Sequence, residues 1–166
     1  MDIRIDDQLQ SSIRGFNIQK AVTKLLRIVP KEHLMGIDKI VIAGQMKKRE
    51  VSGTYRKGGG SEATVIEISF KSVYKKMPKF LFRFPFIPKF MLADALYHEI
   101  GHHFERNLSH GIKKREREKY ADDYGKKMLK KAFFGWLILL YPLKPLVNYL
   151  NKKVQEKDSK RSYPIY

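Results

Sequence analysis

Residues 88–108 read PKFMLADALYHEIGHHFERNL, and this stretch decides how the rest of the chain is organised. Pro88 suits the first turn of a helix, and the stretch is predicted to stay helical through about Leu108. On such a helix His98 and His102 are four residues apart, so they project from one face about 6 Å apart along the axis. That spacing suits two imidazole ligands of one small metal ion.

Two further residues of this stretch fit a constrained metal site. Glu99 lies about 100° round the helix from His98, where its carboxylate can reach a water on the metal without being a ligand. This is the position of a general base. Gly101 costs about 1 kcal/mol in helix propensity relative to alanine, so we expect another backbone to pack closely against it.

The third metal ligand is expected from the next helix. The chain has no cysteine, so the metal must be held by histidine and carboxylate. A catalytic zinc ion takes three protein ligands and keeps one position open. A helix predicted from about residue 112 to 134 offers Glu118 as that ligand. Asp122, one turn later on the same face, would accept a hydrogen bond from the free ring nitrogen of a ligand histidine, most simply His98. Gly125 would let the two helices approach.

The part of the chain before residue 88 predicts a helix followed by a small sheet. Apolar residues recur at helical spacing from Gln8 to Val29. Short β-like runs follow at 39–43, 51–56 and 63–70, separated by glycines. We therefore predict an α+β fold, with an N-terminal helix, a sheet of about three strands, the histidine helix and the glutamate helix. A basic tail from residue 142 would hold one short helix.

Length and charge bound the remaining possibilities. The 166 residues suit one compact domain over the whole chain, with the motifs between about 88 and 131. The 34 Lys and Arg against 17 Asp and Glu give a net charge of +17, which favours acidic partners. The acidic N-terminus lacks the pattern of a secretory signal, and the apolar run 132–141 is too short to span a bilayer. We expect a cytoplasmic protein without a transmembrane span.

Residues 71–93 form a basic, phenylalanine-rich segment that leaves two interpretations open. It carries six Lys or Arg, no acid, and phenylalanines at alternate positions from 80 to 86. These rings can pack into the core beneath a loop. They can also insert at the interface of an anionic membrane, beside lysines that attract the headgroups. A nucleic-acid-binding module ranks behind both, because no known motif accompanies the charge.

The two helical motifs together resemble a known family. His98-Glu99-Ile100-Gly101-His102 paired with Glu118-Lys119-Tyr120-Ala121-Asp122 resembles the gluzincin metallopeptidases, of which the minigluzincins are nearest in size. The resemblance implies a zinc-dependent endopeptidase with one zinc ion held by His98, His102 and Glu118. It implies Glu99 as the base, Asp122 behind a ligand, and an edge strand that pairs with an extended peptide or protein substrate.

The resemblance leaves two questions open. Family members use a Tyr or His to stabilise the oxyanion, and Tyr124, His110 and Tyr141 are the candidates here. The short separation of His102 and Glu118 also resembles the intracellular metallopeptidase-like regulators that cleave repressors, with the same chemistry on a different substrate.

Each candidate site residue could also have an ordinary structural role without a metal. The histidines could lie on an ordinary amphipathic helix, and Glu118 belongs to a run of charges typical of a solvated face. We expect His103 and His110 to be surface histidines. Asp94 is expected at the surface near the start of its helix, where it favours the helix dipole. A zinc-binding protein without catalysis is a further alternative, in which Glu99 would have no purpose.

Overall fold

The computed structural model describes residues 1–6, 9, 16–44, 52–59, 61–74, 84, 86–108 and 113–140. The chain divides into two compact units, Met1–Ala132 and Phe133–Tyr166. Every strand and every described candidate site residue belongs to the first unit. The prediction of one domain over 1–166 stays a prediction, and the short helix expected in the basic tail lies outside the described residues.

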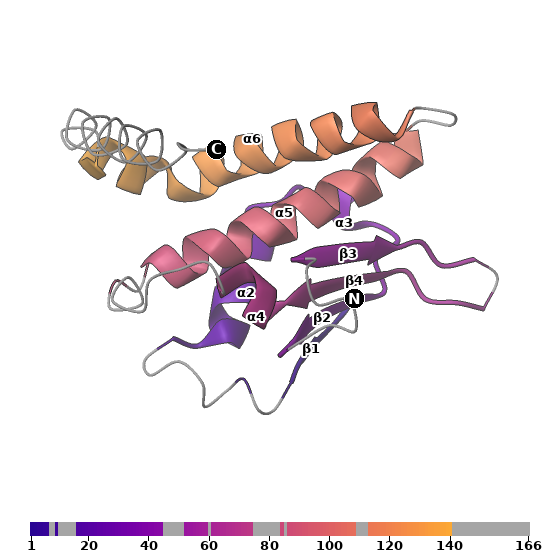
Figure 1. Cartoon of the computed structure of the whole chain (residues 1–166), viewed down its shortest axis with the longest axis horizontal. Helices are drawn as coiled ribbons and strands as arrows, with labels where there is room; N and C mark the ends of the chain where they lie inside the picture. Colours follow the sequence, from indigo (N-terminus) through magenta and orange to yellow (C-terminus); the bar gives the residue numbers. More distant parts are fainter. Residues whose placement is uncertain are drawn as a thin grey trace, which may run out of the picture. The chain divides into compact units, whose positions relative to one another are not determined.

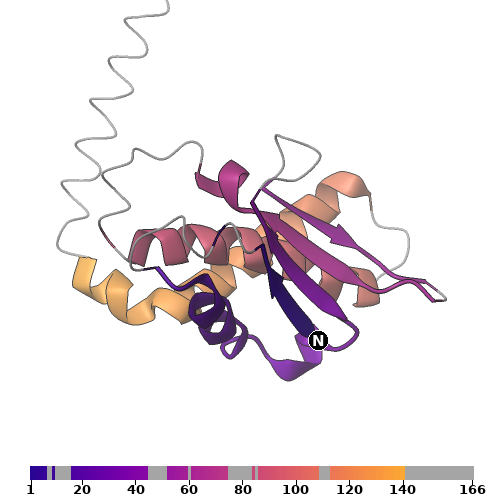
Figure 2. The same ribbon diagram turned by 90° about the horizontal axis from the view of Figure 1, so that it is seen from below.

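A four-stranded sheet forms one layer of the first unit (Figure 2). Its strands are β1 (Asp2–Ile5), β2 (Lys39–Ala43), β3 (Gly53–Arg56) and β4 (Val65–Ser69), and their order is β1-β2-β4-β3. β1, β2 and β4 run parallel, whereas β3 pairs antiparallel with β4. Among the described residues β3 is therefore an edge strand.

Alternation of side chains along the central strands explains why they are buried on one face. Ile40 and Ile42 in β2 lie beside Ile66 and Ile68 in β4, and none of the four is exposed to solvent. Successive side chains of a strand point to opposite faces, so these isoleucines make a continuous apolar surface under the helices.

The expected elements of this region are confirmed with two corrections. The three predicted runs correspond to β2, β3 and β4, but the sheet has a fourth strand, β1, that we did not predict. β1 is a short edge strand with only half-exposed or exposed residues, so no apolar run marks it. The predicted helix from 8 to 29 corresponds in part to α2 (Ile18–Leu26), and residues 10–15 lie outside the described residues. Asn17 caps α2 by accepting a hydrogen bond from the Lys20 backbone N–H at 2.7 Å.

Helix α5 (Phe86–Leu108) is the central element of the first unit (Figure 1). It lies against β3 and β4 and also contacts α2, α3 (Lys31–Leu34) and α4 (Phe70–Tyr74). Leu92, Leu96 and Ile100 recur every four residues and are fully buried, as the packed face of a helix requires. The fold is α+β, as the sequence predicted.

Helix α6 (Lys114–Leu140) runs antiparallel to α5 as far as the unit boundary (Figure 1). A Cβ atom added at Gly101 would lie 2.8 Å from the Cα of Ala121, and one at Gly125 would lie 3.5 Å from the His98 backbone nitrogen. The predicted close backbone contact at Gly101 is confirmed. At Phe133 the backbone leaves helical geometry, so α6 continues past its predicted end through a kink.

Two predictions about membranes have different outcomes. Within the described part of the chain, no helix combines the length and the apolar character needed to cross a membrane. Most of the basic segment 71–93 lies outside the described residues, which include only 71–74, 84 and 86–93 of it. Its binding to a membrane surface stays a prediction.

Candidate metal centre

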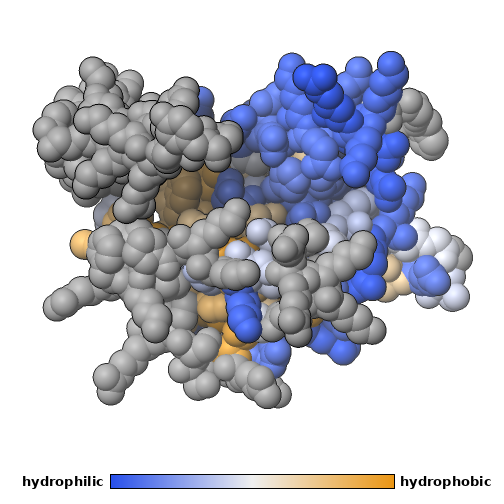
Figure 3. Space-filling view, in the orientation of Figure 1, coloured by the Kyte–Doolittle hydropathy of each residue, from blue (hydrophilic) through white to orange (hydrophobic). Residues whose placement is uncertain are grey.

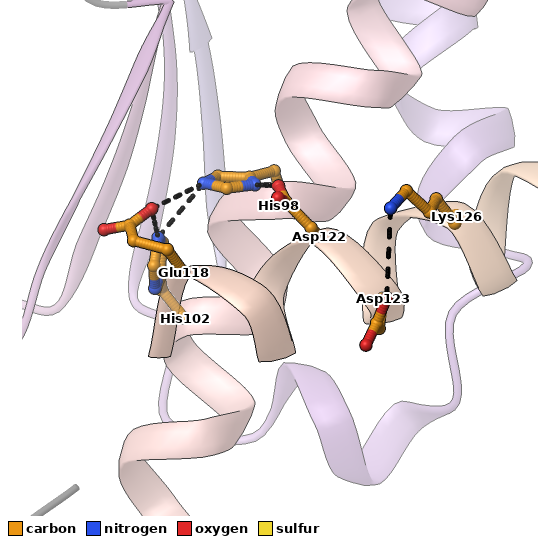
Figure 4. A network of polar contacts seen from close by, with 6 residues as sticks. All are labelled: His98, His102, Glu118, Asp122, Asp123 and Lys126. Atoms are coloured by element: carbon orange, nitrogen blue, oxygen red, sulfur yellow. Dashed lines mark hydrogen bonds and ion pairs between the residues drawn. The ribbon is translucent and has the colours of Figure 1, made fainter. Parts of the chain in front are cut away.

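Three donor atoms from α5 and α6 converge on one point (Figure 4). The Nε2 atoms of His98 and His102 are 3.1 Å apart. An oxygen of Glu118 lies 3.6 Å from the first and 3.5 Å from the second. The two histidines share one face of α5, as their spacing predicted, and the packing of α6 across that face brings Glu118 to them.

The donor set and its dimensions fit a tetrahedral zinc ion. Zinc bonds to imidazole nitrogen and carboxylate oxygen are about 2.0–2.1 Å long, so tetrahedral ligands lie roughly 3.3 Å from one another. The three separations of 3.1, 3.5 and 3.6 Å surround this value. Among the described residues, two nitrogens and one carboxylate converge here and no fourth protein ligand joins them, which is the composition of catalytic zinc sites.

Asp122 orients one of the two histidines (Figure 4). Its Oδ1 atom lies 3.0 Å from Nδ1 of His98, on the side of the ring away from Glu118. A proton on Nδ1 would be donated to this carboxylate, so Nε2 would keep its lone pair directed at the cluster. Carboxylates that hold metal-ligating histidines in this way fix both the tautomer and the ring orientation.

Glu99 is buried beside the cluster and is held there by the edge strand. Only 6% of it is exposed, and it lines the same hollow as His98 and His102. Burial, and to a smaller extent the negative charge of Glu118, raise the pKa of Glu99 to about 7, although a hydrogen bond from the Tyr55 backbone acts in the opposite direction. A Cβ atom at Gly53 would lie 2.7 Å from side-chain atoms of Glu99. Any residue other than glycine at this position would therefore displace the Glu99 carboxylate.

Two hollows adjoin the cluster and share three of their lining residues, Gly53, His98 and Glu99. The first hollow extends toward the start of β3 and is also lined by Ser52, Val73, Met91, Asp94, Ala95, Asp122, Gly125 and Lys126. The second extends along β3 and is also lined by Thr54, Tyr55, His102, Glu105, Arg106, Lys114, Arg117 and Glu118. The cluster therefore lies where the two hollows meet, beside the edge strand.

Two expectations about single residues were wrong. His103 is not a surface residue, since only 2% of it is exposed and its Nε2 atom lies 2.9 Å from the Met35 carbonyl oxygen. The ring points about 100° away from His102 on the helix and packs under the sheet edge instead. Asp94 is exposed, as expected, but it lies in the third turn of α5 and not in the first, because the helix begins at Phe86.

Tyr124, the one oxyanion candidate among the described residues, is not brought to the cluster. The hydroxyl of Tyr124 lies 2.9 Å from Nδ1 of His33 in α3, and Tyr124 lines a separate hollow with Phe104. His110 and Tyr141 lie outside the described residues.

Sequence reasoning missed Gly53 and Tyr55, the two residues by which β3 borders the site. Gly53 makes room for Glu99, and the Tyr55 ring lies edge-on to His103 with its hydroxyl 3.3 Å from Nδ1. The glycine at the start of a β-like run was the available signal, because a glycine inside a strand marks a close approach of another group.

Comparison of the chain with protein family models, with curated proteins and with solved structures finds no match in any of the three.

Proposed function

We propose that this protein is a zinc-dependent endopeptidase that uses Glu99 as its general base. The observation that carries the proposal is the convergence of one possible ligand atom from each of His98, His102 and Glu118. These atoms lie within 4.8 Å of one another, beside the buried carboxylate of Glu99 and an edge strand. A metal site built for structure alone would have no use for a buried carboxylate at its border in addition to its three ligands.

Each residue of the site has a separate task in peptide hydrolysis. A zinc ion held by His98, His102 and Glu118 would lower the pKa of a water molecule and polarise the peptide carbonyl. The Glu99 carboxylate takes the proton of the attacking water and later delivers it to the leaving amine. The burial of Glu99 beside the cluster lets the same carboxyl group accept a proton and then donate it.

The edge strand β3 supplies a surface for a polypeptide substrate. It pairs with β4 along one side only among the described residues, and its Gly53 and Tyr55 border Glu99. An extended peptide that adds a strand to such an edge gains main-chain hydrogen bonds along its length. These main-chain hydrogen bonds would hold the scissile bond of a substrate beside the cluster, whichever side chains the substrate carries.

Metal analysis combined with proteolysis tests the proposal. The purified chain should contain about one zinc ion per molecule and should cleave an unfolded protein, and a chelator should abolish the cleavage until zinc is restored. Glu99→Gln should keep its zinc but lose hydrolysis by a factor of about 10² to 10⁴. Glu116→Gln, which removes an exposed acid at the start of α6, is the matched control.

Two results would reject this function. Cleavage that persists in Glu99→Gln would contradict the role of the base. Stoichiometric zinc without cleavage of any unfolded protein would leave a zinc-binding protein without catalysis.

A further inference from the structure

We propose that the cleft selects polypeptides by charge: an acidic side chain on the side of the scissile bond that faces Arg106, and a neutral or basic one on the other side. The inference rests on the proposed function, because it assigns a substrate class to that site. It rests on how the charged residues are divided between the two hollows that meet at Glu99.

The two hollows form the two ends of one groove along β3. They share Gly53, His98 and Glu99, so a chain lying along the strand passes from one hollow into the other at the cluster. A residue of an extended chain spans about 3.3 Å, so the side chains on either side of a bond at the cluster reach different hollows.

The end toward Arg56 presents positive charge to a substrate. Arg106, Lys114 and Arg117 line it, and the Arg106 guanidinium lies 5.7 Å from the centroid of the Tyr55 ring. Arg106 and Lys114 are exposed. Figure 3 shows hydrophilic residues gathered over the N-terminal part of α6, from which Lys114 and Arg117 come.

The acids of the same hollow do not cancel this charge at its surface. Glu99 and Glu105 are buried, with 6% and 3% exposed, whereas the charge of the exposed Glu118 would be balanced by the zinc ion that it would bind. Arg117 is only half-exposed, so Arg106 and Lys114 are the cations that a substrate carboxylate meets first. A guanidinium anchored over an aromatic ring has lost part of its rotamer freedom, which favours binding of a carboxylate.

The opposite end of the groove disfavours a second acid. Apart from the shared Glu99, its charged lining consists of Asp94 and Asp122, both exposed, and Lys126, whose Nζ atom lies 3.9 Å from Asp123 Oδ1. Val73, Met91 and Ala95 supply its apolar part. This end suits an aliphatic stem with a neutral or positive head, whereas a carboxylate there would face two others.

A simple attraction of acidic peptides would not test this inference, because the chain as a whole carries a net charge of +17. Two isomeric peptides remove that ambiguity. Both contain one Asp and one Lys on either side of the same central apolar pair, in opposite order, so their net charge and composition are identical. Only the arrangement of charges in the groove distinguishes them.

Hydrolysis of the two isomers by the zinc-loaded protein is the first measurement, with the cut positions mapped by mass spectrometry. The isomer that places Asp toward Arg106 should be cleaved with a kcat/KM about 3 to 10 times higher, the range expected for one or two partly exposed ion pairs. Equal kcat/KM values would overturn the inference and leave the peptidase function standing.

Charge variants assign the preference to this end of the groove. Arg106→Gln should bring the ratio of the two isomers close to one, and Arg106→Glu should invert it. Lys130→Gln removes one exposed charge from α6 away from both hollows, so the ratio should be kept. A ratio that falls equally in Lys130→Gln would assign the preference to the general field of the protein and overturn the inference.

A binding measurement separates the two proposals. Fluorescence anisotropy with zinc-loaded Glu99→Gln and the same two labelled peptides should show the same 3- to 10-fold preference without turnover. A preference in binding with no hydrolysis by the wild type would keep the charged groove and reject the peptidase. Equal binding of both isomers would reject the charged groove.

Discussion

Helix α5 is approached closely by two neighbours, α6 at Gly101 and β3 at Gly53, and the two contacts hold different things in place. At Gly101 the nearest atoms are backbone and Cβ atoms of Ala121, so the contact sets the distance between two helices. At Gly53 the nearest atoms belong to the side chain of Glu99, so the contact sets the position of one carboxylate. Both positions require a glycine, but an added Cβ would collide with another helix at Gly101 and with the side chain of Glu99 at Gly53.

This difference separates what the fold needs from what the chemistry needs. The helix contact lets Glu118 and Asp122 reach the two histidines, and a change there would disturb the packed unit as well as the metal cluster. At the strand contact, Gly53 lies against the side chain of Glu99, which lines both hollows. We therefore expect changes at the helix contact to appear in stability and metal affinity, and changes at the strand contact to appear in catalysis.

The largest effect is expected from the two acids that the helix contact brings to the histidines. Glu118→Ala removes one of three proposed ligands and should weaken zinc binding by well over 100-fold, whereas Asp122→Ala should weaken it about 10- to 100-fold. Zinc affinity measured by competition with a chelator of known strength checks the order. The helical circular dichroism of both variants should match the wild type.

Two outcomes would change this assignment. If Asp122→Ala lost zinc while Glu118→Ala kept it, the ligand would be Asp122. If both kept the wild-type affinity, the packing of α6 against α5 would have no role in metal binding.

The second effect is expected at the strand contact. Gly53→Ala places a Cβ 2.7 Å from Glu99, so the carboxylate must shift, and a misplacement of about 1 Å can cost around 100-fold in rate. The loss should appear in kcat with zinc content unchanged. Gly59→Ala is the matched control, because an added Cβ there has no atom within 4 Å. Wild-type kcat in Gly53→Ala would show that the strand does not position Glu99.

The third effect is expected at the helix contact and concerns stability. Gly101→Ala forces a Cβ against the Ala121 backbone and should lower the free energy of unfolding by about 1–3 kcal/mol. Gly125→Ala meets only an ordinary contact, 3.5 Å from the His98 nitrogen, and gains about 1 kcal/mol in helix propensity, so it should be neutral or stabilising. Urea unfolding of both variants at fixed zinc concentration measures the difference. Equal stability of the two would mean that the helices can separate at no cost.

The residues whose placement could be predicted from sequence are those whose neighbours lie within a turn or two of helix. His98, His102 and Gly101 have a spacing that is meaningful on any helix, and Glu118 and Asp122 repeat it on the next one. The β-like runs that correspond to β2 and β4 were predicted for the same reason, since the pattern of a strand is local.

The residues that sequence missed depend on partners far along the chain. His103 meets Met35 and Tyr55, and Gly53 meets Glu99, only because β3 and the loop after α3 pack against α5. No local spacing encodes such a meeting. β1 was missed because a short edge strand with exposed side chains carries no apolar pattern.

The smallest effect is expected on the far side of α6, where Tyr124 turns away from the metal cluster. Tyr124→Phe removes a hydroxyl that lies 2.9 Å from His33 Nδ1 in a partly buried contact, so stability should fall by about 0.5–1.5 kcal/mol. Tyr120→Phe removes the hydroxyl of an exposed tyrosine on the same helix and should cost less. Because the Tyr124 hydroxyl is held at α3, kcat and zinc affinity of the folded variant should stay at the wild-type level. A kcat about 100-fold lower with unchanged stability would mean that Tyr124 leaves His33 to stabilise the oxyanion during turnover, and the separation of the two sides of α6 would then fail.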